Sequence, residues 1–233
     1  LDLVQFHWWR YEVPGMVEVA GLLDDLRRAG KIRHLALTNT DAPHTRALLD
    51  AGVPLVATQV QYSVLDRRPA ARLAPLALER GLQLLCYGSV AGGFLAEAWR
   101  GAAEPAAALE NRSLTKYRLV IDDCGGWGAF QRLLEALGDV AARHGVGIAN
   151  VAQRWVLDQP GTGAVIVGFR SEASARRTLA TLGLTLSAAD HAQLGAVLAG
   201  QPMPAGDVYA AERDARSPHA GIIRYDLNQA SEG

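Results

Sequence analysis

Short apolar runs alternate along this chain with longer segments whose apolar residues recur at helical spacing. The candidate strands span residues 3–7, 34–38, 56–60, 82–87 and 164–167. Helical patterns between and after them cover residues 16–29, 43–50, 69–80, 148–157 and 171–181, and a further helix begins at Ser187. This alternation predicts an α/β fold made of βα units around a parallel sheet.

Polar groups gather where the candidate strands end. His7 closes the first strand, Asn39 follows the second, Gln59 lies near the end of the third, and Ser89 follows the fourth. In a barrel of parallel strands the carboxyl ends form one rim, and active sites are built there. Because side chains alternate along a strand, His7 shares a face with Gln5 and is expected to point into the barrel at this rim.

Two stretches lack a clear strand or helix pattern. Residues 90–130 form a long connection rich in Gly, Ala and charged residues, and connections of this length are usually functional lids or disordered. After Gln201 the chain contains Pro202, Pro204 and Gly206 and shows no periodicity. We therefore divide the chain into a barrel domain over residues 1–200 and a C-terminal tail over residues 201–233.

Composition and charge argue against several classes of partner. The 23 Lys and Arg residues nearly cancel the 24 Asp and Glu residues, so no overall field attracts nucleic acid or an anionic membrane. No apolar run reaches the roughly 20 residues that cross a bilayer, and the first residues lack the basic head of a signal peptide. A cytoplasmic protein is expected. Cys86 and Cys124 lack metal-site spacing, which predicts two free thiols and no metal.

Several stretches together resemble the aldo-keto reductase family, from Leu1 to about Leu198. They are residues 1–8, residues 30–33 leading to Thr38-Asn39, residues 59–67, residues 86–93 and residues 165–171. Their joint order and spacing carry the resemblance. It implies a (β/α)8 TIM barrel, here incomplete, with about the last five βα units. The first residue, Leu1, opens directly inside an apolar run, so we expect that an upstream segment is absent.

The resemblance also implies a reaction. Members of the family reduce carbonyls with a nicotinamide cofactor, using a Tyr as proton donor, a Lys and an Asp that support it, and a His that orients the carbonyl. Only the His has a match, His7. The other three residues would precede Leu1. Hydride addition builds negative charge on the carbonyl oxygen, so His7 alone would be a poor substitute for the whole group.

The cofactor residues are better represented. By resemblance, Thr38, Asn39 and Gln59 would bind the nicotinamide carboxamide, and Tyr87 would stack on its ring. The turn over the pyrophosphate matches residues that are mostly small: Gly88, Ser89, Val90 and Gly92. The adenosine 2′-phosphate would lie against the loop and helix start formed by Gly168, Phe169, Arg170 and Ser174. This favours NADP(H) over NAD. Arg177-Thr178 stands where many members have Glu-Asn, which leaves the adenine contacts open.

The intact protein is thus expected to be an NADP-dependent oxidoreductase that reduces a small-molecule aldehyde or ketone. An alternative is a non-catalytic NADP-binding interaction protein of the same fold, and a third is a truncated, inactive product. A homo-oligomer is left open. Trp8 and Trp9 are equally compatible with a substrate pocket and with packing. Residues 66–68, Asp-Arg-Arg, predict a salt-bridge cluster at the rim.

Overall fold

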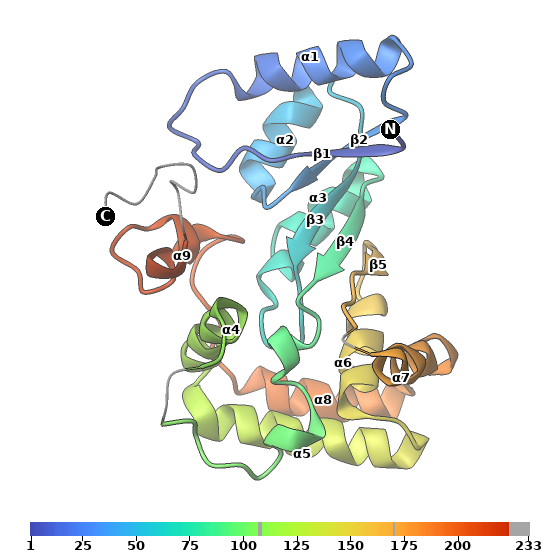
Figure 1. Cartoon of the computed structure of the whole chain (residues 1–233), viewed down its shortest axis with the longest axis vertical. Helices are drawn as coiled ribbons and strands as arrows, with labels where there is room; N and C mark the ends of the chain where they lie inside the picture. Colours follow the sequence, from blue (N-terminus) through green and yellow to red (C-terminus); the bar gives the residue numbers. More distant parts are fainter. Residues whose placement is uncertain (107–108, 170, 224–233) are drawn as a thin grey trace.

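A five-stranded parallel sheet forms the centre of the molecule (Figure 1). The computed structural model describes residues 1–106, 109–169 and 171–223. The strands follow one another in chain order: β1 (Leu3–Phe6), β2 (His34–Thr38), β3 (Leu55–Gln61), β4 (Gln83–Tyr87) and β5 (Thr162–Val165). All four neighbouring pairs are parallel. The predicted α/β class and the five strands are confirmed, with boundaries that shift by one or two residues.

Helices connect the first four strands and cover one face of the sheet. They are α1 (Met16–Arg28), α2 (Ala42–Asp50) and α3 (Leu73–Arg80), with the 3-10 helix η1 (Arg68–Ala70) before α3. The Asp41 side chain caps α2 by accepting a hydrogen bond from the His44 backbone N–H. Gly81, with a φ of 69°, ends α3 in the left-handed conformation that glycine adopts without strain.

The two faces of the sheet differ in burial. Leu35 and Leu37 of β2 and Leu84 of β4 are at most 2% exposed on the face toward the helices. The alternate positions include Thr38 and Gln59, which are only half-buried. Neighbouring parallel strands bring Thr38 and Gln59 side by side, so the second face ends in polar side chains at the carboxyl rim.

A second layer of helices packs beyond this rim. It contains α4 (Arg112–Asp123), α5 (Gly126–His144), α6 (Ile148–Leu157), α7 (Glu172–Gly183) and α8 (Ala188–Ala199), with 3-10 turns η2 (Ala91–Gly93) and η3 (Glu97–Trp99). Residues 90–130 are therefore not one irregular connection, and the expectation of a disordered stretch is wrong over α4, whereas a lid role stays a prediction. Asn111 caps this helix, and Tyr117, Val120 and Ile121 bury its inner face. Its many charged residues hid that pattern in the sequence.

The chain after Gln201 turns back toward the rim. It forms the short helix α9 (Ala210–Arg213) and the 3-10 turn η4 (Ala220–Ile222), and η4 contacts α4 (Figure 1). Both cysteines are free and buried, as expected. Among the described residues, no helix is long and apolar enough to cross a membrane, and no group of three or more His, Cys, Asp or Glu could hold a metal ion.

Candidate functional site

The rim of the sheet brings together the polar residues that close β2, β3 and β4. The register places Thr38 beside Gln59 and Gln61 beside Tyr87. Asn39 follows with a φ of 56°, a left-handed conformation that Asn tolerates better than most residues. Its backbone N–H donates to the Gln59 carbonyl at 3.0 Å. The backbone conformation of Asn39 and this hydrogen bond therefore fix the position of Asn39 beside Gln59 at the rim.

A chain of hydroxyl groups crosses this rim. The Tyr87 hydroxyl donates to Asn39 Oδ1 at 3.1 Å and lies 2.6 Å from the Tyr209 hydroxyl. Because the Tyr87 proton is used toward Asn39, Tyr209 supplies the proton of the shorter contact. The Gln61 backbone N–H in turn donates to Tyr209 Oη at 3.0 Å. Burial raises the pKa of Tyr87 to about 12, so the phenol is neutral at ordinary pH.

His7, predicted as the last residue of the first strand, lies one residue past the end of β1, with its ring 5.9 Å from that of Trp9. The Arg213 guanidinium packs 4.4 Å from the Trp9 ring and 4.1 Å from the Tyr11 ring. It also donates to the backbone carbonyls of Trp9 and Asn39. Burial, and then the positive charge of Arg213, lower the pKa of His7. The imidazole is therefore neutral at neutral pH and offers one donor and one acceptor.

Replacing Arg213 with Met is expected to raise the pKa of His7, because a positive charge that opposes protonation is removed. The pKa should stay below 6.5, since the ring remains partly buried. A titration of the His7 ring resonances by NMR measures the shift. Arg216→Met is the control, because this side chain is 90% exposed and pairs with Asp214. An unchanged or lower pKa in Arg213→Met would contradict the assignment.

A tight turn leads away from β4. Gly88 and Gly92 have φ values of 72° and 67°, and Ala91 donates its backbone N–H to the Gly88 carbonyl at 2.8 Å. The Tyr117 ring of α4 covers the turn. A Cβ added at Gly88 would stand 2.1 Å from the Tyr117 hydroxyl oxygen, and one at Gly92 would stand 2.7 Å from its ring. The glycines are therefore required by protein packing as well as by backbone conformation.

Beside this turn lies an open cleft of about 910 Å³, between the turn, α4 and the start of α7. Seven residues of the predicted cofactor site line it: Gly88, Ser89, Val90, Gly92, Gly168, Phe169 and Ser174. Arg170 lies outside the described residues. The remaining predicted residues, His7, Thr38, Asn39, Gln59 and Tyr87, are not among the lining residues and belong to the rim. The site thus has two parts, joined where Tyr87 precedes Gly88.

The cleft is suited to a ligand with negative charge and hydrogen-bonding capacity. Ser89 is 1% exposed, and its hydroxyl has no partner among the described residues. At the start of α7, Ser171 Oγ accepts from the Ser174 backbone N–H at 3.2 Å. The N-terminus of this helix presents backbone N–H groups and a positive dipole end, and Arg177 also lines the cleft. Glu110 is a carboxylate on the opposite wall.

Two groups of site residues were not predicted from the sequence. Ser113 and Tyr117 line the cleft from α4, and helical spacing within residues 112–123 was the signal that could have found them. Tyr209 and Arg213 reach the rim from the C-terminal segment. No pattern in the sequence indicates that contact, because it joins residues far apart along the chain.

Comparisons with known proteins place this geometry in context. A model of the aldo/keto reductase family matches residues 1–199. The flagellar radial spoke protein 5 of Chlamydomonas reinhardtii is 30% identical over 177 residues, which is 68% of this chain and 33% of that protein. The NADH-specific methylglyoxal reductase of Escherichia coli (strain K12) is 28% identical over 197 residues, 82% of this chain and 56% of the reductase.

A solved structure shares the fold. The glycerol dehydrogenase from Gluconobacter oxydans superposes with a TM-score of 0.73 at 23% identity, covering 88% of this chain and 61% of that one. The chain therefore spans a third to three fifths of the length of these three proteins.

Proposed function

The chain belongs to the aldo/keto reductase family, and from this premise we propose that it carries the cofactor-binding side of an NADP-dependent oxidoreductase. The whole protein would reduce an aldehyde or ketone to an alcohol. The observation that carries the proposal is the cleft itself. It is lined by the glycine turn and by the start of α7, and it contains the partnerless hydroxyl of Ser89.

The residues present fit a nicotinamide cofactor. Ser89 and the turn from Gly88 to Gly92 would hold the pyrophosphate, and the start of α7 at Ser171 would receive the 2′-phosphate. Arg177 would add positive charge beside that phosphate. This supports NADP(H), although a relative is named as NADH-specific, so the preference is part of the proposal. When bound, the reduced nicotinamide supplies the hydride.

At the rim, this chain's residues would position both reactants. Asn39 and Gln59 would orient the carboxamide, and Tyr87 would carry the ring. The neutral imidazole of His7 would donate a hydrogen bond to the substrate carbonyl oxygen, where negative charge builds during hydride addition. Two of these groups are already engaged, since Tyr87 bonds to both Asn39 and Tyr209.

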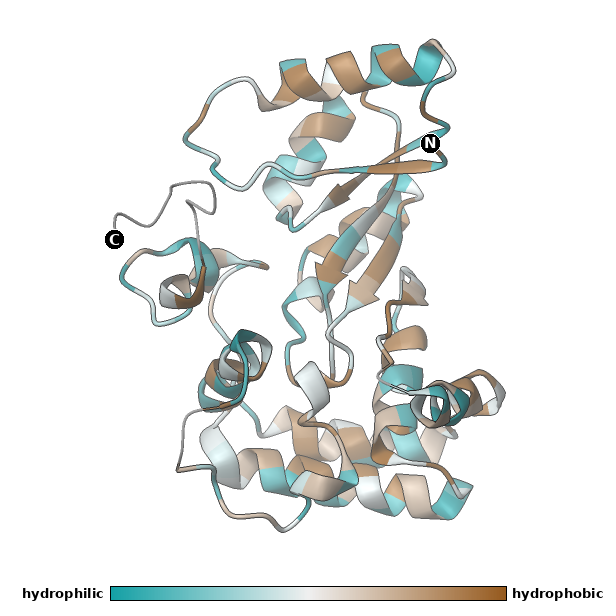
Figure 2. Cartoon of the chain, in the orientation of Figure 1, coloured by the Kyte–Doolittle hydropathy of each residue, from teal (hydrophilic) through white to brown (hydrophobic). Residues whose placement is uncertain are grey.

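We propose that the proton donor and its Lys and Asp partners come from outside these 233 residues, in the rest of a (β/α)8 barrel. In the described part of the chain, β1 pairs only with β2, and β5 pairs only with β4. Val17, Leu22 and Leu26 of α1 are 38–63% exposed, and Figure 2 shows the corresponding apolar bands in brown. Open sheet edges and exposed apolar helix faces are expected where further βα units would pack.

A specific observation supports the alternative of a non-catalytic NADP-binding interaction protein. The Tyr209 hydroxyl lies 2.6 Å from that of Tyr87, the residue proposed to carry the nicotinamide ring, so this part of the rim is already engaged by the chain itself. The relative with 30% identity is, by its name, a flagellar radial spoke protein. Saturable NADPH binding without carbonyl-dependent turnover, in the protein with its complete coding sequence, would favour this alternative.

Cytoplasmic localisation and the oligomeric state stay predictions.

The test is oxidation of NADPH by the whole protein, with a broad panel of aldehydes and ketones and with NADH in parallel. We expect carbonyl-dependent oxidation with preference for NADPH. Ser89→Ala should raise the KM for NADPH by about 3–10-fold, the worth of one hydrogen bond, with a smaller effect on kcat. Absence of turnover across the panel, or a KM for NADPH that is the same in Ser89→Ala as in the unmodified protein, would contradict the proposal.

A further inference from the structure

We infer that the C-terminal segment over residues 207–219 is an internal competitor for the nicotinamide half of the cofactor site. In this form of the protein, the segment holds the rim closed and leaves the adenine-nucleotide half open. The inference rests on the proposed function. It predicts a protein that binds half of its cofactor freely and binds the other half only when the segment leaves.

Tyr209 occupies the centre of the rim. It is 2% exposed, and its hydroxyl contacts the Tyr87 hydroxyl and accepts from the Gln61 backbone N–H. Its ring also meets that of Trp9 edge-on at 5.8 Å. Asn39 Oδ1 already accepts from the Tyr87 hydroxyl, which in turn contacts the Tyr209 hydroxyl. A carboxamide that bonds to Asn39 would therefore have to break this hydrogen-bonded chain, and this places the nicotinamide and Tyr209 in competition.

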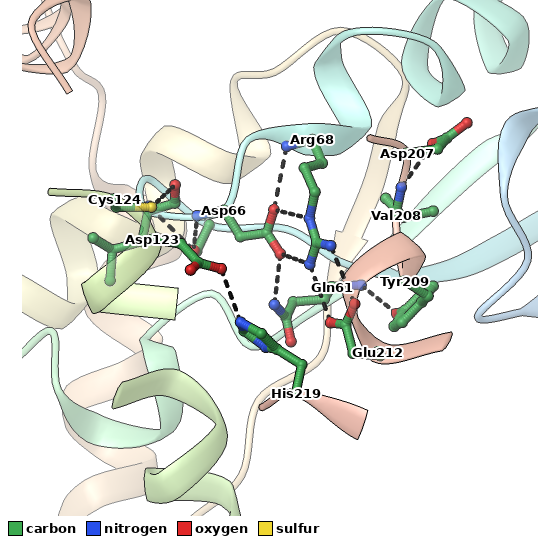
Figure 3. Close-up of polar contacts among 12 residues, drawn as sticks. Gln61, Asp66, Arg68, Asp123, Cys124, Asp207, Val208, Tyr209, Glu212 and His219 are labelled. Carbon is green, nitrogen blue, oxygen red and sulfur yellow. Dashed lines mark hydrogen bonds and ion pairs between the residues drawn. The ribbon is translucent and has the colours of Figure 1, made fainter. Parts of the chain in front are cut away.

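Further contacts hold the segment on both sides of Tyr209, and Figure 3 shows those of Glu212 with Arg68 and of His219 with Asp123. Before it, Asp207 accepts from the Ala42 backbone N–H at the start of α2. After it, Glu212 pairs with Arg68, Arg213 donates to the Asn39 carbonyl at 2.7 Å, and His219 pairs with Asp123 at 2.8 Å. These partners come from the start of α2, the loop after β2, η1 and the end of α4. The closed form is thus anchored at several points on the rim.

A buried charge cluster accompanies these anchors. Asp66, Arg68 and Glu212 are at most 2% exposed and carry one negative charge in sum. The Lys116 ammonium group lies within 5.4–5.8 Å of the ring centres of Tyr87, Tyr117 and Tyr209, and can balance that charge. Release of the segment would remove one wall around Lys116 and separate Glu212 from Arg68, so displacement carries a cost.

The segment also contains a feature that favours release. Tyr209 has a φ of 63°, in the left-handed region that large side chains avoid. A backbone held in this conformation relaxes when the segment leaves the rim. By contrast, none of the described residues after Gln201 lines the cleft that would take the adenine nucleotide. The two halves of the site therefore differ in access. The segment competes with the cofactor at the rim half and leaves the adenine-nucleotide half open.

The test compares NADPH with adenosine 2′,5′-bisphosphate, which has the adenine-nucleotide half and lacks nicotinamide, by calorimetric titration. For the unmodified protein, the two Kd values should agree within about threefold. The affinity that the nicotinamide half adds is offset by the free energy needed to displace the segment from the rim. Tyr209→Ala should tighten NADPH by about tenfold or more and leave the bisphosphate Kd within twofold. Tyr209→Phe, which keeps the ring but loses both hydrogen bonds, should fall between.

Arg216→Ala is the matched control within the same segment. Its side chain is 90% exposed and, within the described residues, is paired with Asp214 two positions earlier, so neither Kd should change. An equal effect of Tyr209→Ala on both ligands, or no effect on NADPH, would overturn the inference while the proposed function stands. If neither ligand bound to any of these proteins, the proposed function would fail together with the inference.

Hydrogen exchange of the unmodified protein gives a second readout that needs no variant. Saturation with NADPH should speed amide exchange in residues 207–219, because the segment must leave the rim. Saturation with adenosine 2′,5′-bisphosphate should leave those rates unchanged. Equal or slower exchange with NADPH would mean that segment and cofactor occupy the site together, which contradicts competition.

Discussion

Arg68→Met is expected to lower the free energy of unfolding by about 3–5 kcal/mol, because removing one partner of a buried ion pair leaves uncompensated charge. The Arg68 guanidinium donates to both oxygens of Asp66, at 2.9 and 2.7 Å, and to both oxygens of Glu212 at 3.1 Å. Methionine can fill part of the space but satisfies neither carboxylate. Chemical denaturation followed by circular dichroism measures the loss.

Arg46→Met is the matched control. Arg46 also makes a two-pronged pair, with Glu79 at 3.0 and 2.9 Å, but both side chains are about half exposed. Water can replace such a pair, so the denaturation midpoint should hardly move. Similar losses of unfolding free energy in the two variants would show that burial does not account for the stabilisation by the cluster around Arg68.

The contribution of Asp66 to the pH dependence of stability should change sign in Arg68→Met. Burial alone would raise the pKa of Asp66, but the hydrogen bonds and charge of Arg68 outweigh it and hold that pKa below its ordinary value. Its stabilising contribution is therefore present above the ordinary carboxyl pKa of about 4 and is lost as pH falls. Without Arg68, burial dominates and the folded-state pKa of Asp66 rises above its ordinary value. The Asp66 contribution to stability should then grow as pH falls toward 4, so the loss caused by Arg68→Met should shrink over that range.

Gly88→Ala is expected to weaken binding of adenosine 2′,5′-bisphosphate by at least about 100-fold, equivalent to about 2.7 kcal/mol. The new Cβ would stand 2.1 Å from the Tyr117 hydroxyl oxygen, so the ring must move. Tyr117 lines the cleft, and displacing it changes the wall against which the ligand would lie. Calorimetric titration measures the binding loss, and circular dichroism checks that the variant is folded.

Two further variants separate the clash from backbone strain. Gly93 has a φ of 110°, and a Cβ there would meet nothing within 4 Å, so Gly93→Ala carries the strain without the clash. Gly93→Ala should bind adenosine 2′,5′-bisphosphate more tightly than Gly88→Ala does. Adding Tyr117→Leu to Gly88→Ala should restore part of the lost affinity, and the double-mutant cycle gives the coupling. Equal losses in both glycine variants would show that strain alone explains the result.

Periodicity predicted the strands well, because each buried strand has a short apolar run bounded by turn residues. It failed over α4, where Arg112, Lys116 and Arg118 mask the apolar face that Tyr117 and Ile121 form. The start of α3 was also misplaced. The helix was expected over residues 69–80, but η1 ends at Ala70 and α3 begins at Leu73. Boundaries near a proline depend on local turn geometry that composition does not specify.

The site was predictable in outline, and its division into two parts was not. Ser89 follows a strand end, where parallel sheets place ligands, whereas Gly92 was assigned through the family resemblance. The predicted salt-bridge cluster at residues 66–68 is confirmed for Asp66 and Arg68, but its third member, Glu212, lies 144 positions from Arg68. Contacts at that separation depend on tertiary packing, which a local pattern cannot report.

The most direct test of the central claim is to map adenosine 2′,5′-bisphosphate onto the backbone amides by NMR. We claim that the glycine turn and the start of α7 bind the phosphates of a nicotinamide cofactor. Saturable shifts should therefore concentrate in Ser89 to Gly93 and in Ser171 to Ser174, and the amides of α2 should not move. Shifts centred elsewhere, or none at saturating ligand, would contradict the claim.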